Sequence, residues 1–122
     1  AKNNGYALIF VGLYHTITDR LGQYQCADQV LAWTGQNTQV PLFSFWDFSI
    51  GPQLAIGGLV ISGQQQGETA ANLVRKILGE TNKLRFPPRI APRGEYVFSR
   101  AALAHWGIQL PDDIAHRTVW RE

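Results

Sequence analysis

The chain contains no methionine and only one cysteine among its 122 residues. Cys26 alone cannot form an internal disulfide, and no Cys/His pattern has the spacing of a zinc site. We therefore expect no disulfide framework, no metal and no other cofactor, and this thiol does not decide the redox compartment. The absence of methionine even at position 1 leads us to expect a piece excised from a longer protein.

Charge of either sign and long apolar runs are also scarce. The formal net charge is only +2, and the basic residues are scattered, so we expect no nucleic-acid partner. No apolar run approaches the ~20 residues that a membrane span needs, so we expect no direct membrane insertion in this segment. An apolar content of 45% fits one compact domain with a modest core.

The first half of the chain has the pattern of a βαβ unit. A continuous apolar run over 6–13 predicts a strand buried on both faces, and 19–25 reads as an exposed loop. Asp28 is a candidate N-cap for a short helix over 29–35. A second strand is predicted over 41–45, and the right-handed crossover makes the two strands parallel.

The middle of the chain predicts a third strand over 59–62, preceded by a possible helical turn at 54–56. A flexible polar connector is expected over 63–67. The clearest helix pattern covers 68–78, where apolar residues recur on one stripe. These residues are Ala70, Leu73, Val74, Ile77 and Leu78.

The last third of the chain begins with a proline-rich segment, 81–94, which predicts a connecting loop. A short strand follows at 95–98. Ser99 is expected to cap a helix over 100–106, and Gly107 to end it.

These elements predict an α/β fold, a three-layer sandwich with a short, mainly parallel sheet. We assign the domain to residues 1–111 and describe 112–122 as a polar C-terminal tail. Within that tail, Val119 and Trp120 are possible docking residues.

One carboxylate follows the second predicted strand. Asp47 lies between Trp46 and Phe48, and a carboxylate accepts hydrogen bonds from hydroxyl, amide or ammonium groups of a ligand. The two aromatic rings could cover an apolar or sugar-like face. The alternative is that both rings belong to the core and Asp47 caps a turn.

Polar residues also follow the first predicted strand. His15 and Asp19 could act as a general base and its orienting carboxylate. However, no nucleophile lies in a recognisable motif, and neither G-x-S-x-G nor a P-loop is present. Ligand contact by Tyr14 or His15, or simple loop polarity, are the other interpretations. His105 and His116 are expected at the surface.

The glycines near the third strand do not match dinucleotide-binding spacing. We expect Gly51, Gly57 and Gly58 to permit a turn or a close backbone approach. The three glutamines at 64–66 could bond a ligand or line a hinge.

Four motifs occur in a characteristic order: P-L-F-S-F-W-D-F-S-I-G, A-I-G-G-L-V-I-S-G, Q-G-E-T-A-A-N-L-V-R-K-I-L-G-E and Y-V-F-S-R-A-A-L-A-H-W-G-I-Q-L-P. In this order they resemble the C-terminal part of the periplasmic-binding-protein-like family of ABC-transporter substrate-binding proteins. The best matches are Gly67 to Glu80 and Trp106 to Pro111. The W-D-F-x-I-G form resembles the branch fused to bacterial sensor histidine kinases and diguanylate cyclases.

The resemblance implies one lobe of a type I periplasmic binding protein, in which two α/β lobes close over a small molecule. It implies that the N-terminal lobe of the same protein is missing here, and its exposed interface could drive homodimerisation. Loops facing the cleft map to residues 12–15 and 46–48, and the crossover maps to Ser62. The ligand-binding residues implied in this way are Tyr14, His15, Trp46, Asp47, Phe48, Ser62 and Gln64.

The function that the resemblance implies is that of a small-molecule-binding sensory domain in a bacterial signal-transduction protein. The ligand would be an amino acid, a sugar or an aromatic compound. The location would be periplasmic or extracytoplasmic, within a membrane-associated protein. One alternative is the solute-binding component of an ABC transporter, and a second is a flavodoxin-like-fold enzyme that uses His15 and Asp19.

Overall fold

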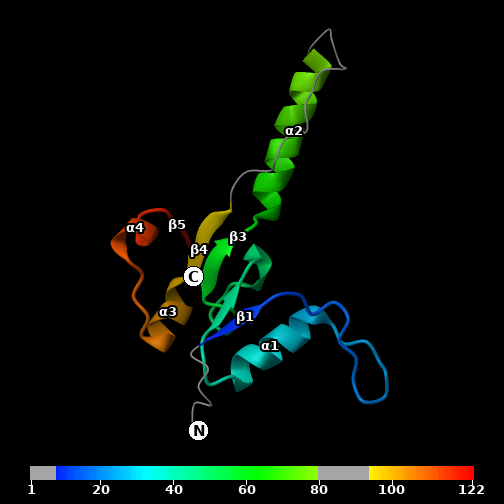
Figure 1. Ribbon diagram of the computed structural model, residues 1–122, viewed down its shortest axis with the longest axis vertical. Helices are drawn as coiled ribbons and strands as arrows, with labels where there is room; N and C mark the ends of the chain where they lie inside the picture. The colour runs from blue at the N-terminus through cyan, green and yellow to red at the C-terminus, as the bar shows by residue number, and fades with distance from the viewer. Residues whose placement is uncertain (1–7, 80–93) are drawn as a thin grey trace.

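The computed structural model describes residues 8–79 and 94–122, which contain one five-stranded sheet (Figure 1). The strands follow the order of the chain across the sheet: β1 (Ile9–Val11), β2 (Leu42–Ser44), β3 (Gly57–Val60), β4 (Glu95–Ser99) and β5 (Thr118–Arg121). β1, β2 and β3 are parallel, β4 is antiparallel to β3, and β5 is parallel to β4. This confirms an α/β fold with a mostly parallel sheet.

The predicted βαβ unit is formed by β1, helix α1 (Ala27–Asn37) and β2. Leu31 of α1 packs against Val11 and Leu42, which joins the helix to one face of the sheet. The prediction that Asp28 is the N-cap was wrong. Cys26 occupies that position, and Asp28 lies in the first turn, where a carboxylate is favoured by the helix dipole.

The glycine-rich segment before β3 does not contain the predicted helical turn at 54–56. Ala55 instead pairs with Ile50 in a β-bridge. The predicted close approach is confirmed at two glycines, because a Cβ on Gly58 would lie 2.3 Å from the Ser44 carbonyl oxygen, and one on Gly57 would lie 2.4 Å from that of Val97. These glycines allow β3 to sit between its two neighbours.

Helix α2 (Gly63–Gly79) is longer than predicted, and the segment 63–67 is helical rather than a flexible connector. Glutamine is a good helix former, and the Ser62 hydroxyl accepts a hydrogen bond from the Gln65 backbone N–H at 3.4 Å. No residue of α2 is buried, and the helix projects away from the sheet (Figure 1). Its predicted apolar stripe is therefore left without a partner among the described residues.

The end of β4 leads into α3 (Arg100–Trp106) as predicted. The Ser99 hydroxyl accepts a hydrogen bond from the Ala102 N–H at 3.2 Å, and Gly107 ends the helix with a φ of 62°. The predicted loop over 81–94 lies outside the described residues, apart from Gly94.

The last residues are not a polar tail outside the domain. Residues 112–115 form α4 (Asp112–Ala115), and 118–121 form β5, the fifth strand of the sheet. Trp120 packs against the cluster of Phe98 and Leu103, and valine, threonine and tryptophan are favoured in strands. The C-terminal segment therefore belongs to the same core as the rest of the sheet.

The two faces of the sheet are covered unequally. Helix α1 packs on one face, and α3 packs on the other face through Phe98, Ala102 and Leu103. On the α3 face, Phe10 and Phe45 remain about half exposed and stack at 5.4 Å between ring centroids. This end of the sheet is an apolar surface that no helix within 8–79 or 94–122 covers.

Candidate functional site

The segments that follow β1, β2 and β3 meet at one edge of the sheet. Parallel strands end on the same side, and ligands of open α/β sheets bind at that carboxyl edge. A bridge between Trp46 and Ile61, with a 3.1 Å hydrogen bond from the Ile61 N–H to the Phe45 carbonyl, continues the pairing of β2 and β3 there. The structure thus brings most of the predicted site residues to one edge.

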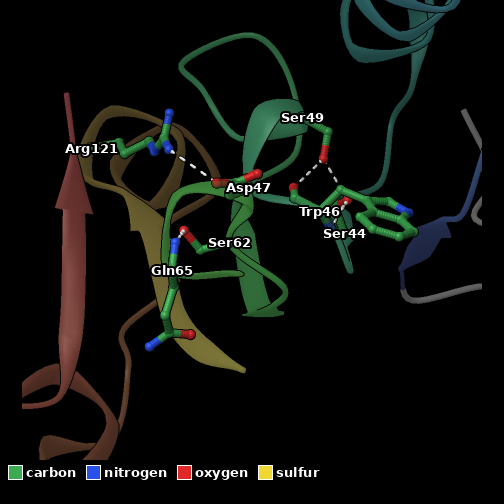
Figure 2. A network of polar contacts seen from close by, with 7 residues as sticks. All are labelled: Ser44, Trp46, Asp47, Ser49, Ser62, Gln65 and Arg121. Atoms are coloured by element: carbon green, nitrogen blue, oxygen red, sulfur yellow. Dashed lines mark hydrogen bonds and ion pairs between the residues drawn. The ribbon is translucent and has the colours of Figure 1, made fainter. Parts of the chain in front are cut away.

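Asp47 begins a short 3-10 helix, η1 (Asp47–Ser49), directly beyond β2. Its carboxylate faces Arg121 at the end of β5, with 4.0 Å between Oδ2 and Nη2 (Figure 2). The side chains are 20% and 46% exposed, respectively. An ion pair this long and this exposed contributes at most about 1 kcal/mol, so both groups keep hydrogen-bonding capacity for a ligand.

The structure also answers the question that the sequence left open about this turn. The N-cap of η1 is Trp46, and the Asp47 carboxylate accepts no backbone hydrogen bond from the described residues, so it does not cap the turn. Phe48 is 57% exposed and stacks on Trp46 at 6.2 Å. Neither Phe48 nor Asp47 is therefore a core residue.

A buried network that the sequence did not suggest holds the backbone on both sides of Trp46, immediately before Asp47. Ser44 accepts a hydrogen bond from the Trp46 N–H at 3.0 Å, Ser49 donates to the Trp46 carbonyl at 2.7 Å, and the two hydroxyl groups bond each other (Figure 2). Ser44 and Ser49 are 1% and 2% exposed. A serine at a core-facing strand position was the only signal in the sequence.

The network also separates Trp46 from Asp47. In Figure 2 the Trp46 indole points to the side opposite the Asp47 carboxylate and Arg121. The predicted wall of Trp46, Asp47 and Phe48 is therefore not a single surface. Asp47 belongs with Arg121, which sequence reasoning missed, because Arg121 reaches the site only through the unpredicted strand β5.

Tyr14 and His15 lie on the other side of η1, beside Phe48. Together with parts of β1 and α1 they line a hollow of about 20 Å³, which is room for little more than one water molecule. The Tyr14 hydroxyl donates to Thr34 at 3.4 Å, which ties it to α1. This part of the edge does not hold a ligand of amino-acid or sugar size in the present arrangement.

Ser62 and Gln64 follow β3. Ser62 is buried at 6% exposure and accepts the Gln65 N–H at the start of α2, next to the bridge that holds Trp46. Gln64 donates to Glu68 at 2.9 Å on the exposed surface of α2. Ser62 directly follows Ile61, which pairs with Trp46, the residue before Asp47.

Asp19 does not orient His15. Its two carboxylate oxygens accept from the Leu21 and Gln23 N–H groups at 2.9 Å and from the Gln25 amide at 3.2 Å, so Asp19 stabilises its own turn. Within residues 8–79 and 94–122 no group of three or more His, Cys, Asp or Glu side chains could hold a metal ion.

Comparisons with protein-family models, with curated proteins and with solved structures gave no match to this chain. In the described ranges no helix has both the length and the apolar character needed to cross a bilayer.

Proposed function

We propose that this chain is the second lobe of a small-molecule-binding sensory domain, built as a three-layer sandwich like one lobe of a type I periplasmic binding protein. The observation that carries the proposal is the pair of Asp47 and Arg121. Asp47 follows the end of the parallel strand β2, and its carboxylate lies 4.0 Å from the guanidinium of Arg121, the last residue of β5, with both side chains partly exposed. A charged pair held this loosely beside a strand end is suited to being bridged by a ligand.

The chemistry of the pair favours a ligand that carries both a donor and an acceptor. Asp47 would accept hydrogen bonds from an amino or hydroxyl group, and Arg121 would donate two to a carboxylate. An amino acid satisfies both groups better than a neutral sugar does. An aromatic compound without polar groups is the least suitable, because Trp46 points away from the pair.

The bare apolar stripe of α2 supports the presence of the other, N-terminal lobe in the full-length protein. None of its 17 residues is buried, whereas an isolated helix of this length is only marginally stable in water. The stripe is a suitable contact for the first lobe, which we expect upstream. Closure of the two lobes over ligand would then bias the output of a membrane-associated histidine kinase or diguanylate cyclase, with the sensory part in the periplasm.

The proposal can be tested by isothermal titration calorimetry on the full-length protein with a panel of amino acids and sugars. Asp47→Asn should weaken binding of the active compound at least fivefold, because a hydrogen bond to a charged group contributes about 1.5–3 kcal/mol. Asp113→Asn is the matched control, since Asp113 is an exposed carboxylate in α4. Unchanged affinity in Asp47→Asn would remove Asp47 from the site.

A further inference from the structure

A second hollow lies at the edge of the sheet opposite to Asp47. Its volume is about 620 Å³, within the range of small-molecule sites, which is roughly 300–1,000 Å³. The last turn of α1, the turn before β3, the start of β2 and the end of α3 form its walls. Because β4 runs antiparallel to β3, α3 follows it at the amino ends of the parallel strands. The described lining of this hollow includes neither Asp47 nor Arg121, so the hollow is separate from the site that these two residues form.

The electrostatic environment of this hollow is negative. Among the described residues, no aspartate, glutamate, lysine or arginine lines it, whereas α1 and α3 both end there. The carboxyl end of a helix carries a partial negative charge, up to about half an elementary charge. Helix α1 has no basic residue in its last turn, and α3 has only His105. The negative ends of two helices thus meet a cavity without a lysine or arginine to balance them.

The last turn of α1 also leaves carbonyl oxygens free. The Thr38 N–H donates a hydrogen bond to the Thr34 carbonyl at 2.9 Å. The carbonyls of Gly35 and Gln36 accept no hydrogen bond from any residue in the described part of the chain, and both residues line the hollow. Unpaired carbonyls at a helix end need a donor from water or from a ligand.

The remaining wall is apolar and aromatic. Trp106 is half-buried at the end of α3, and Leu42 and Leu54 lie beside it in the lining. The face of an indole ring attracts cations, more strongly than the face of any other side chain. We propose that this hollow binds an organic ammonium ion, whose apolar body packs on Trp106 while its N–H groups donate to the carbonyls of Gly35 and Gln36.

The test compares 2-phenylethylammonium with 2-phenylethanol, which differ in carrying an ammonium or a hydroxyl group on the same apolar body. Titration calorimetry on the chain at pH 8 should show the ammonium ion binding at least tenfold more tightly. Equal affinities would mean that the hollow binds only the apolar body of the two compounds and does not recognise the ammonium group. Either that result or no measurable binding would overturn the proposal.

Variants at an exposed position keep the fold and change only the charge of the hollow. Gln36 is exposed, so Gln36→Lys should weaken 2-phenylethylammonium binding at least fivefold and Gln36→Glu should strengthen it. Trp106→Leu should weaken it as well, with thermal melting used to check folding. If Asp47→Asn removed the binding and the Gln36 variants did not change it, the cation would occupy the carboxyl edge and the proposal would fail.

Discussion

The contact between Gly58 and Ser44 allows a quantitative test of how β2 and β3 are held together. Gly58→Ala places a Cβ 2.3 Å from the Ser44 carbonyl oxygen, where ordinary contacts begin above 3 Å. The two strands must therefore separate by somewhat less than 1 Å, or β3 must rotate. Overpacking of this kind costs about 1–3 kcal/mol, and we expect the upper half of that range, because the obstacle is backbone rather than a side chain.

The measurement is urea unfolding of Gly58→Ala, followed by circular dichroism. For a domain of this size a loss of about 2–3 kcal/mol also lowers the melting temperature by roughly 8–12 °C. Gly67→Ala is the matched control: a Cβ there meets nothing within 4 Å, inside helix α2. The control should be neutral or stabilise the helix by up to about 1 kcal/mol. If both variants unfolded at the same urea concentration, the close approach of β2 and β3 would be refuted.

Two further changes test the buried network and the bare helix. Ser49→Ala should destabilise the domain by about 1–3 kcal/mol, because the Trp46 carbonyl and the Ser44 hydroxyl each lose a partner. Ser49→Cys is a control of similar size. If Ser49→Ala unfolded at the same midpoint as the parent chain, the result would argue against the network. Leu78→Gln combined with Val74→Gln should leave the unfolding free energy of the chain within about 0.5 kcal/mol, since both side chains are more than half exposed. The same pair should reduce self-association in analytical ultracentrifugation, and a large loss of stability would show that α2 packs inside the chain.

Features that depend on neighbouring residues were predictable from the sequence. Ser99 and Gly107 bracket α3 because a hydroxyl N-cap and a left-handed glycine satisfy groups only a few residues away. The parallel pairing of β1 and β2 follows from the short helix between them. Gly58 was recognisable as a place of close approach, although its contact, Ser44, was not.

Features that depend on distant residues were not predictable. β5 is four residues long, and nothing in those residues alone says that they pair with β4. Without β5, Arg121 could not be placed opposite Asp47. The backbone at Trp46, just before Asp47, is held by hydrogen bonds to Ser44 and Ser49, which lie far from the surface once β2 is buried. The helical start of α2 was missed because three consecutive glutamines fit a connector as well as a helix.

The shortness of β2 has a thermodynamic consequence for the two edges of the sheet. β2 contains three residues, with Leu42 in the wall of the amino-edge hollow and Ser44 in the network that holds the backbone just before Asp47. Two residues along a strand span only about 7 Å. If occupancy of one edge shifts β2, the free-energy coupling must act equally in both directions. Titrating the Asp47 ligand in the presence of the ammonium ion, and the reverse, would then measure the coupling free energy that one short strand transmits between the two sites.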